Sequence, residues 1–478
     1  MSEYNLISSE DISNLSRGEI IKYYRDHVSP GLANFMKILG FDRVEIDHAE
    51  GMYIHTKCGR KILDFSGGLS VLNHGHNHPR ILKVRKKFNE EKRLEICKAF
   101  ISPYQSVLAR NLSEIFPGDL KYTFFCNSGA EANEGALKSA LLYHGKSKDK
   151  IVYTDIGYHG KTFGAMSVSG PGGYKELFKT IDGCIEVPYG DIDAVKKLFE
   201  ERSRNGKNDI AAMILEAIDG DHVVIPPEGY LKALALLCRR YGVIMIIDEI
   251  FTGFGKTGKM FAFEHEGIIP DIVTFSKSLG GGKASIAGYI VTSRIFKATY
   301  ASMKRCTVHT TTFGGLGEEC ATAVEALNII NDEGLVENAR EKGHYLLSRM
   351  LLLKDKYPGY IENIRGIGLL CLVELRKATE IFDHELIKKI PNIDDMLTGL
   401  IPALIISDLF RTFDTLVYPG GRSDVLLLSP ALIVTKDEID VFVSALDRIL
   451  SKNLVNLAGG MIIGGIRDGL IAKGNSEK

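Results

Sequence analysis

Apolar residues follow two different rhythms along the chain, and the two rhythms alternate through its middle half. Short uninterrupted apolar runs are typical of strands that are buried on both faces. Five such runs occur in order, at 121–125, 150–154, 211–218, 242–248 and 271–275. Between them lie segments with apolar residues every three or four positions, as in an amphipathic helix, and 230–242 is the clearest. This alternation predicts a mostly parallel sheet covered by helices.

The two ends of the chain have a different pattern. Near the N-terminus, a helical spacing over 17–28 precedes two β-rich runs within 51–68, which predict a hairpin turning at Cys58-Gly59. After residue 331 come a long helical stretch, two strand-like runs and a last helix, at 335–357, 367–375, 424–429 and 435–450. Thr435 and Glu438 open that last helix with a capping box.

We therefore predict one large domain flanked by the two parts of a smaller one. Residues 1–75 form the N-terminal part of the small domain, 76–330 the large domain, 331–450 the C-terminal part of the small domain, and 451–478 a tail. The predicted fold class is α/β, with a smaller α+β domain made from both ends of the chain.

Composition narrows the classes of function. The 478 residues are 45% hydrophobic and 25% charged with a net charge of −1, which argues against a nucleic-acid or membrane partner. The eight cysteines are scattered without a CxxC pair, so a reducing cytoplasm is the expected location. The start of the chain is polar and does not resemble a signal peptide. The apolar run at 397–407 is short and contains Pro402, which favours a buried segment over a membrane span.

Two glycine-lysine-threonine sequences suggest a nucleotide-binding site, but neither completes the required motif. They lie in "YHGKT" (158–162) and "GFGKTGK" (253–259). A phosphate-binding loop of the GxxxxGK[ST] type needs a glycine five residues before the GK pair. Those positions hold Asp155 and Ile250, so neither sequence predicts an ATP or GTP site.

A strand-to-helix junction offers a different anion site. In "FFCNSGAEANEGALKSA" (124–140) a strand ends, small residues turn, and a helix begins. Free N–H groups and the positive end of the helix favour a phosphate at such a junction, and the Ser128 hydroxyl can add a donor. Simple capping of the helix by Asn127 or Ser128 would use the same residues. From the residues alone, both interpretations stay open.

Two ionisable residues end neighbouring strands of the predicted sheet. Asp248 ends the run at 242–248, and Lys277 follows the run at 271–275. The carboxyl ends of such strands are where open α/β sheets bind ligands. A metal is a weaker interpretation of Asp248, because no histidine or third carboxylate is close in sequence. A strand-end aspartate, a strand-end lysine and a phosphate-binding turn together describe a pyridoxal 5′-phosphate (PLP) site.

Five motifs carry a resemblance to a known family. In order they are "NSGAEANE", "GYHGKTFGAMSVSG", "DEIFTGFGKTGKMFAFEHEGIIPDIVTFSKSLGGG", "HTTTFGG" and "IRGIGLL". With them the chain, over roughly residues 30 to 450, resembles the class III (ornithine/amine-type, omega) aminotransferases of PLP fold type I. The resemblance implies a seven-stranded, mostly parallel sheet, the cofactor PLP, and a homodimer with shared active sites.

The resemblance also implies a role for each matched residue. Lys277 would form the Schiff base with the cofactor and move a proton, and Asp248 would pair with the ring nitrogen. The ring would lie between Tyr158 and Ile250, and His159 would hold a position beside it. The other matched residues are expected to contact the cofactor or its phosphate: Ser128, Gly129, Ala130, Glu216 and, on the neighbouring subunit's cofactor, Thr312. The glycines after Lys277 are expected to let the backbone pass close to the cofactor.

Several positions depart from the family pattern around the substrate. Members that use amino acids carry an arginine that grips the α-carboxylate, and Leu427 stands at that position. Arg422 resembles the mobile arginine of amine transaminases, but an ordinary solvated arginine fits equally well. Phe251 stands where glutamine is usual, and Asp221 and His222 replace a glutamate and a small residue. These differences predict a reshaped substrate pocket.

We therefore predict a PLP-dependent aminotransferase with a ping-pong mechanism. It would move an amino group between an amine or omega-amino donor and an oxo acid or aldehyde. The missing arginine favours at least one substrate without an α-carboxylate, such as a diamine, a terminal amine or an aldehyde. An enzyme of the same fold that acts on an α-amino acid stays an open alternative: an ornithine-like transaminase, racemase, aminomutase or decarboxylase. No metal is expected at the alternating histidines His74, His76 and His78, which a loop explains.

Overall fold

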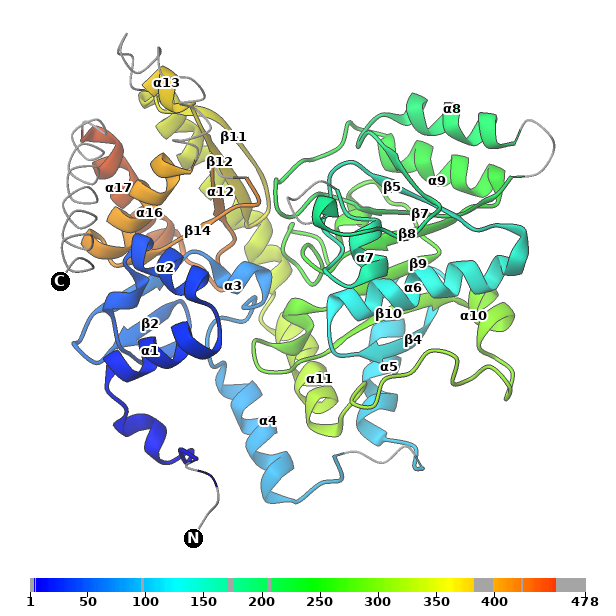
Figure 1. The fold of residues 1–478 in the computed structure, drawn as a ribbon, viewed down its shortest axis with the longest axis horizontal. Helices are drawn as coiled ribbons and strands as arrows, with labels where there is room; N and C mark the ends of the chain where they lie inside the picture. The colour runs from blue at the N-terminus through cyan, green and yellow to red at the C-terminus, as the bar shows by residue number, and fades with distance from the viewer. Residues whose placement is uncertain are drawn as a thin grey trace, which may run out of the picture.

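The computed structural model describes residues 4, 6–95, 99–170, 175–203, 208–381, 399–422 and 424–452. Figure 1 shows two lobes side by side, one around the central sheet and one that contains both ends of the described chain. Within the described residues, no helix combines the length and apolarity needed to cross a lipid bilayer.

The large lobe is built on a seven-stranded sheet, which confirms the predicted fold class. In spatial order its strands are β4 (Leu120–Cys126), β10 (Ala287–Thr292), β9 (Ile272–Phe275), β8 (Ile244–Asp248), β7 (Ile210–Glu216), β5 (Lys150–Thr154) and β6 (Cys184–Val187). Only β10 runs antiparallel to its neighbours β4 and β9. The parallel order places the carboxyl ends of β7, β8 and β9 side by side.

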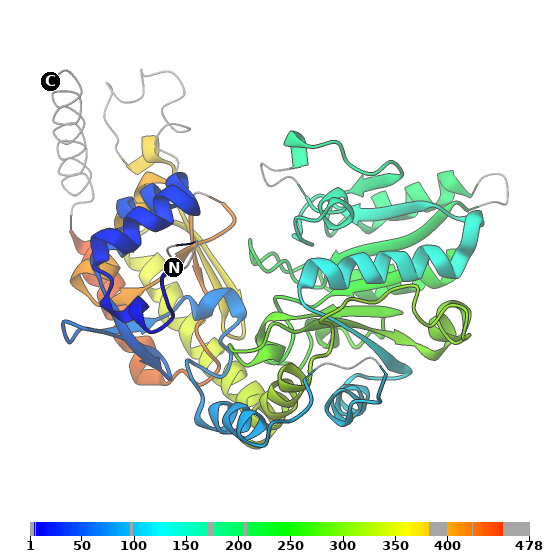
Figure 2. The ribbon, with the colours of Figure 1, turned by 60° about the horizontal axis from the view of Figure 1, so that its bottom comes forward.

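Helices cover both faces of this sheet. Helix α6 lies along one face, as Figure 2 shows, and packs on β7, β8, β9 and β10. The helices of the large lobe and its edge are α4 (Pro79–Glu90), α5 (Pro103–Ile115), α6 (Gly129–His144), α7 (Phe163–Ser167), α8 (Ile192–Arg202), α9 (Tyr230–Tyr241), α10 (Ser293–Thr299) and α11 (Gly317–Asp332). Successive side chains of a strand point to opposite faces of the sheet. In β8, Ile246 packs on the face that α6 covers, while Met245 and Ile247 pack in the core on the other face.

The second lobe joins segments from both ends of the chain. Its first sheet is β1 (Ile46–Glu50), β2 (Tyr53–Thr56), β3 (Lys61–Asp64) and β13 (Thr415–Leu416), and its second is β11 (Ile361–Ile367), β12 (Leu370–Leu375), β15 (Val425–Leu428) and β14 (Tyr418–Pro419). Strands β2 and β3 form the predicted hairpin. Strand β13 pairs with β3 in parallel, more than 350 residues away in sequence. The domain limits at residues 75 and 330 stay predictions.

Seven helices complete this lobe as described. They are α1 (Arg17–His27), α2 (Pro30–Leu39), α3 (Gly67–Ser70), α12 (Leu335–Lys356), α13 (Ala378–Ile381), α16 (Leu400–Thr412) and α17 (Lys436–Ser451). The capping box of Thr435 and Glu438 opens α17 as predicted. Helix α16 contains most of the apolar run at 397–407 and is largely buried. Of the predicted tail, residues 453–478 lie outside the described part of the chain.

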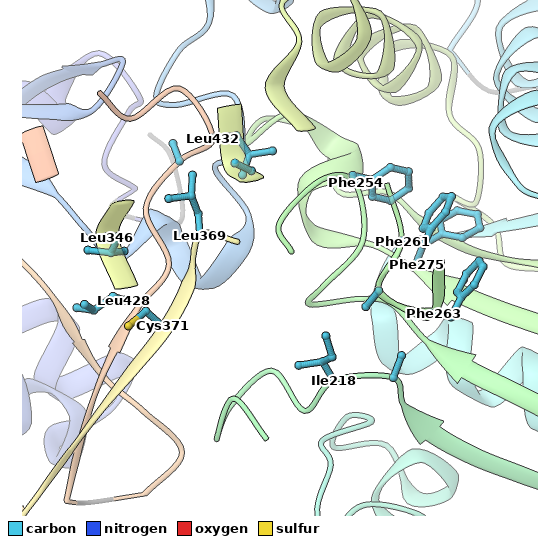
Figure 3. Close-up of a cluster of buried hydrophobic side chains, with 14 of the residues drawn as sticks. Ile218, Phe254, Phe261, Phe263, Phe275, Leu346, Leu369, Cys371, Leu428 and Leu432 are labelled. Carbon is cyan, nitrogen blue, oxygen red and sulfur yellow. The ribbon is translucent and has the colours of Figure 1, made fainter. Parts of the chain in front are cut away.

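One hydrophobic cluster connects the two lobes. Figure 3 shows four phenylalanines of the large lobe on one side: Phe254, Phe261, Phe263 and Phe275. On the other side are Leu346, Leu369, Leu428 and Leu432. Since all eight side chains belong to the same buried cluster, the two lobes share a core.

Candidate active site

Lys277 lies two residues beyond the end of β9, where it opens the short 3₁₀ turn Lys277–Gly280. Its φ of +41° is in the left-handed region that side chains rarely adopt. The Nζ atom lies 3.7 Å from the centroid of the Phe251 ring, a cation–π distance. Burial lowers the pKa of Lys277, while the carboxylates of Asp221, Glu216 and Asp248 act in the opposite direction. The amine is therefore easier to deprotonate than that of a surface lysine.

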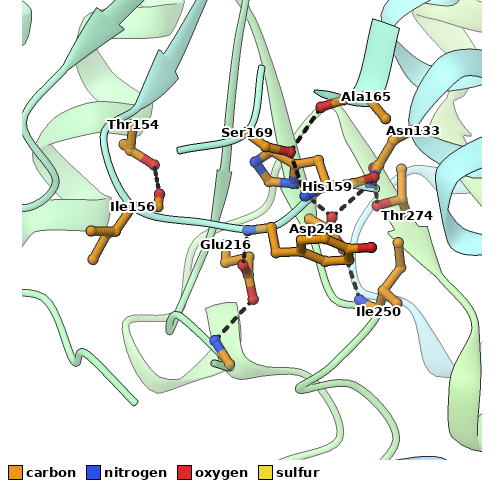
Figure 4. Close-up of polar contacts among 12 residues, drawn as sticks. Asn133, Thr154, Ile156, His159, Ala165, Ser169, Glu216, Asp248, Ile250 and Thr274 are labelled. Atoms are coloured by element: carbon orange, nitrogen blue, oxygen red, sulfur yellow. Dashed lines mark hydrogen bonds and ion pairs between the residues drawn. The ribbon is translucent and has the colours of Figure 1, made fainter. Parts of the chain in front are cut away.

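Asp248 ends β8 and is almost completely buried, at 2% exposure. Its Oδ2 atom accepts hydrogen bonds from Asn133 Nδ2 (2.8 Å) and interacts with His159 Nδ1 (2.7 Å), and its Oδ1 accepts from the N–H of Ile250 (2.9 Å). Figure 4 shows these contacts converging on the carboxylate. Thr274 Oγ1 donates to Asn133 Oδ1 (2.8 Å). Residues from α6, β9 and the loop after β5 therefore hold Asp248 in one orientation.

His159 contacts the buried aspartate, as the predicted positioning role requires. Its N–H donates to Ser169 Oγ (3.0 Å), and its own carbonyl accepts from Asn133 Nδ2 (2.8 Å). Its Nε2 atom is buried and has no hydrogen-bond partner in the described structure. With the proton on Nδ1, the ring donates to Asp248 and supports its charge.

Glu216 ends β7 and is buried beside Asp248. Its two oxygens accept hydrogen bonds from the N–H groups of Tyr158 (2.8 Å) and Gly220 (2.9 Å). Burial, together with the carboxylates of Asp219 and Asp248, holds the pKa of Glu216 well above its usual range. The residue thus fixes the loop that carries Tyr158, which is 47% exposed at the edge of the site.

The strand-to-helix junction is at once a cap and an anion cradle. Ser128 caps α6, and Glu131 Oε2 accepts from the N–H groups of Asn127 (2.7 Å) and Ser128 (3.0 Å). The next two N–H groups, of Gly129 and Ala130, make no hydrogen bond to any described residue. A Cβ atom on Gly129 would lie 2.6 Å from Ile250 Cδ1. The turn therefore presents two donors at the positive end of a helix, which fits a phosphate group.

A cavity of about 260 Å³ brings the predicted site residues together. Of the thirteen residues predicted to bind the cofactor or substrate, eleven line it: Ser128, Gly129, Ala130, Tyr158, His159, Glu216, Asp221, Asp248, Ile250, Phe251 and Lys277. A phosphate cradle, a fixed carboxylate and an amine that line one cavity fit PLP. A second cavity of about 610 Å³ opens beside the first and shares Tyr158, Asp221, Phe251 and Lys277 with it.

Two predicted residues lie outside both cavities. Thr312 is exposed within the loop 301–316 and does not line the site of its own chain. Arg422 is exposed as well and forms ion pairs with Asp424 and with Glu374, whose Oε1 is 2.8 Å from its Nη1. In the described conformation Arg422 is thus bound to two carboxylates and does not face the cavities.

Leu427 lies in β15, where the family pattern has an arginine, and is 1% exposed. It belongs to a small apolar cluster with Val223, Phe251, Leu370, Leu372 and Val425, against which Leu69 packs. Since Phe251 and Leu69 also line the larger cavity, this cluster forms an apolar wall behind it. No guanidinium stands there to bind a carboxylate.

The glycines after Lys277 do not have the role that the sequence suggested. None of Gly280, Gly281 and Gly282 lines either cavity. A Cβ atom on Gly281 would lie 2.4 Å from Ile81 Cδ1, and one on Gly282 would lie 2.6 Å from Leu72 Cδ2. The glycines therefore permit close packing against α4 and its preceding loop, not against the cofactor.

The three alternating histidines have three different partners. His74 Nε2 lies 2.9 Å from the carbonyl of Ala326, His76 Nε2 lies 2.9 Å from Asp64 Oδ2, and His78 Nε2 lies 3.2 Å from Glu333 Oε1. Across the described ranges, no group of three or more histidine, cysteine or acidic side chains is arranged to hold a metal ion.

The site also contains residues that were not predicted, among them Asn133, Asp219 and Lys161. Asn133 is completely buried within α6 and bonds Asp248. Asp219 is buried and holds His222. Lys161 lines both cavities. A buried amide inside a helix was the available signal for Asn133, whereas Lys161 was read only as part of an incomplete nucleotide motif.

Comparison with known proteins agrees with this geometry. A family model described as aminotransferase class-III matches residues 40–450. The structure of an (S)-enantioselective omega-transaminase from Thermomicrobium roseum is 29% identical, with a TM-score of 0.79 over 93% of this chain and 99% of that chain. A transaminase from the marine bacterium Virgibacillus is 25% identical, with a TM-score of 0.75 over 88% and 94%.

An ornithine aminotransferase from Toxoplasma gondii is also similar. It is 25% identical, with a TM-score of 0.78 over 95% of this chain and 100% of that chain, and its structure has partial occupancy of PLP at the active site.

Proposed function

This chain is a member of the class III aminotransferase family, and we propose that its amino donor is an amine whose reacting carbon bears no carboxylate. The family uses PLP to transfer amino groups between small amines and oxo compounds. The observation that supports the proposal is the apolar cluster around Leu427. A buried guanidinium would be needed there to pair with an α-carboxylate, and burying that carboxylate without a partner is costly.

We assign the proton-transfer role to Lys277. When bound, PLP withdraws electrons from the carbon that loses its proton. Burial lowers the pKa of Lys277, so at neutral pH its Nζ atom can accept a proton more readily than a surface amine can. Phe251 packs against the same Nζ atom and excludes water from it.

Asp248 and His159 are proposed to act as a pair on the ring nitrogen. Three hydrogen bonds fix the Asp248 carboxylate, which would hold a proton on that nitrogen. The Gly129 and Ala130 N–H groups would bind the phosphate, with Tyr158 and Ile250 on the two faces of the ring.

We also propose a homodimer located in the cytoplasm. Thr312 does not line the site of its own chain, which supports a role toward the site of a second copy. Exposed apolar side chains flank it in the same loop, including Met303 at 94% and Phe313 at 60% exposure. Scattered cysteines without a CxxC pair support the location.

Half-reaction spectroscopy tests the donor. Holoenzyme is mixed with single candidate donors without an acceptor, and the absorbance of the cofactor is followed as it takes up the amino group. We expect terminal amines to convert the cofactor fully, and matched α-amino acids to react at least about 10-fold more slowly. Lys277→Ala serves as the control, because it should lose the imine absorbance of the resting enzyme.

Two results would overturn the proposal. One is faster conversion by α-amino acids than by amines of the same length. The other is release of a product with the amino group still attached, which would mean racemisation, decarboxylation or migration of the amino group.

A further inference from the structure

Asp221 occupies a structured turn at the entrance to the site. The turn closes through a hydrogen bond from the N–H of Asp219 to the carbonyl of Val224 (3.1 Å). Asp219 is buried, and its Oδ1 atom accepts from the N–H of His222 (2.6 Å) and contacts His222 Nδ1 (2.9 Å). Asp219 and His222 on either side of Asp221 are thus both fixed, so the turn sets the position of Asp221.

The second lobe packs directly on this turn. A Cβ atom on Gly421 would lie 3.0 Å from Asp221 Cβ and 3.3 Å from His222 Nε2, and one on Gly420 would lie 3.4 Å from the Asp221 carbonyl. Gly420, Gly421 and Asp221 all line the larger cavity. The site at Asp221 is therefore built from both lobes.

The Asp221 carboxylate has no partner of its own in the described structure. It lines both cavities and is only partly exposed. No described residue donates a hydrogen bond to it or forms an ion pair with it, although Asp219, Glu216 and Asp248 nearby are all bonded. Burial raises the pKa of Asp221, and the Lys277 amine acts against that rise. A carboxylate held half-buried without a donor favours a cation from outside the chain.

The charged residues that line the larger cavity sum to a negative charge while the Lys277 amine is bound to the cofactor. Its charged lining residues are Asp155, Asp221, Lys161 and Lys277, besides His222. His222 is bonded to Asp219, which raises the pKa of His222 and makes the two a neutral pair when the ring is charged. With the Lys277 amine committed to the cofactor, two carboxylates face one lysine. That lysine, Lys161, is exposed, so solvent screens it more than it screens Asp221.

Apolar side chains also line the cavity. Leu69, Val71, Ile156 and Phe251 line it, and the cluster around Leu427 supports Leu69 and Phe251 from behind. A methylene chain fits such a surface, since burying each CH₂ contributes about 0.8 kcal/mol. A ligand with an apolar middle and a positive group at its free end matches both surfaces.

We propose that the donors of this enzyme carry a second positively charged amino group, as diamines and longer polyamines do, and that Asp221 binds that second group. This inference rests on the proposed function, because it takes an amine without an α-carboxylate as the donor. It adds the residue that selects among such amines.

A charge series at constant length tests the inference. Pentylamine, 1,5-diaminopentane and 5-aminopentanoate share a five-carbon chain and end in a neutral, a positive and a negative group. With the holoenzyme we expect kcat/KM to fall in the order diamine, monoamine, amino acid, with at least about a 10-fold step between the first two. Asp221→Asn should lower kcat/KM for the diamine by about 10- to 100-fold more than it lowers kcat/KM for pentylamine, mainly through KM.

Asp221→Glu and Asp193→Asn are the matched variants. The first keeps the charge at the site and should retain a preference for the diamine. The second removes the same charge from an exposed position on α8 and should leave all three substrates unchanged.

Unreactive tertiary amines give a readout that is independent of turnover. N,N,N′,N′-tetramethyl-1,5-diaminopentane and N,N-dimethylpentylamine cannot form an imine, and their competitive inhibition constants should differ by about 10-fold in the wild type and by less than about 2-fold in Asp221→Asn. Equal use of pentylamine and the diamine, or equal losses for both in Asp221→Asn, would overturn the inference. If only α-amino acids react, the proposed function fails, and the inhibition constants still decide the role of Asp221.

Discussion

At the scale of single residues, the burial of Glu249 next to the active site makes its charged carboxylate unfavourable. It follows Asp248 directly but is completely buried and does not line either cavity. Its oxygens accept from Thr252 Oγ1 (2.6 Å) and from the N–H of Phe263 (2.9 Å), with no cation among these partners. Burial raises the pKa of Glu249 to about 7.

This shift predicts a specific dependence of stability on pH. Between its ordinary value of 4.5 and about 7, the folded protein holds a proton that the unfolded chain has released. The contribution of Glu249 to the free energy of unfolding is therefore fully present below about pH 4.5 and is lost as the pH rises through 7. Glu249→Gln keeps a neutral side chain of the same shape, so it should gain stability relative to the wild type across this window, by on the order of 3 kcal/mol.

Denaturant unfolding at pH 5 and pH 7.5 measures this difference. Glu200→Gln, at an exposed position on α8, provides the control and should follow the wild type at both values. Parallel curves for the wild type and Glu249→Gln would contradict the assignment.

The residues proposed to act on the cofactor could be predicted from the sequence where an ionisable residue ends or follows an apolar run. Asp248 and Lys277 each end or follow an apolar run, and the two runs are adjacent strands of the sheet. Asn133 was not predictable in the same way. It sits inside α6, and only the folded structure brings it to Asp248 across 115 positions of sequence. Contacts of that kind depend on packing, which spacing does not encode.

At the scale of elements, two glycines set the contact between α12, the β11–β12 turn and the loop after Gly255. A Cβ atom on Gly343 would lie 2.2 Å from the carbonyl carbon of Gly368, which is backbone and cannot move aside. Gly368 has a φ of +56°, and a Cβ atom there would lie 2.4 Å from the carbonyl carbon of Thr257. The helix, the turn and the loop therefore approach one another at backbone distance.

Gly343→Ala should break this contact. One methyl group must displace α12 from the turn, and overpacking of this kind costs about 1–3 kcal/mol or more, even though alanine favours the helix by up to about 1 kcal/mol. The free energy of unfolding in denaturant measures the loss. Gly359→Ala is the matched control, since a Cβ atom there has nothing within 4 Å. Equal stability of the two variants would show that this contact can accommodate the added methyl group.

The elements themselves were predicted unevenly, and the misses have physical reasons. Strand β5 was predicted to the residue, and β4, β7, β8 and β9 to within two residues at either end. Strand β6 was missed because it is short, and only its last residue is buried. Strand β10 was missed although it lies between β4 and β9, because Gly288 interrupts its apolar run. Glycine is required there, since a Cβ atom would lie 2.5 Å from the carbonyl oxygen of Phe124.

At the scale of the whole molecule, the substrate cavity belongs to neither lobe alone. Asp221 reaches it from the large lobe, and Gly68 and Gly420 reach it from segments at opposite ends of the chain. The pairing of β3 with β13 brings those two segments together. The family pattern predicted which residues differ around the substrate, but the apolar wall and the unpartnered carboxylate emerge only from this assembly.

The residues of the loop 301–316 lead us to predict that two copies of the chain share their active sites. It exposes Met303 and Phe313 while leaving Thr312 outside the cavities of its own chain, and exposed apolar side chains of this size favour burial against a partner. We expect the wild type to sediment as a dimer and Phe313→Asp to shift it toward the monomer with at least about 10-fold weaker retention of PLP.

Thr312→Ala separates assembly from cofactor binding, because it should keep the dimer and weaken PLP retention alone, through the loss of one hydroxyl donor. Leu236→Asp places the same charge on another exposed side chain, on the outer face of α9, and should alter neither property. Sedimentation velocity with a parallel spectroscopic titration of PLP reads both quantities on one sample. A wild-type monomer that retains PLP fully would refute the shared site, since each chain would then complete its cofactor site without Thr312 of a second copy.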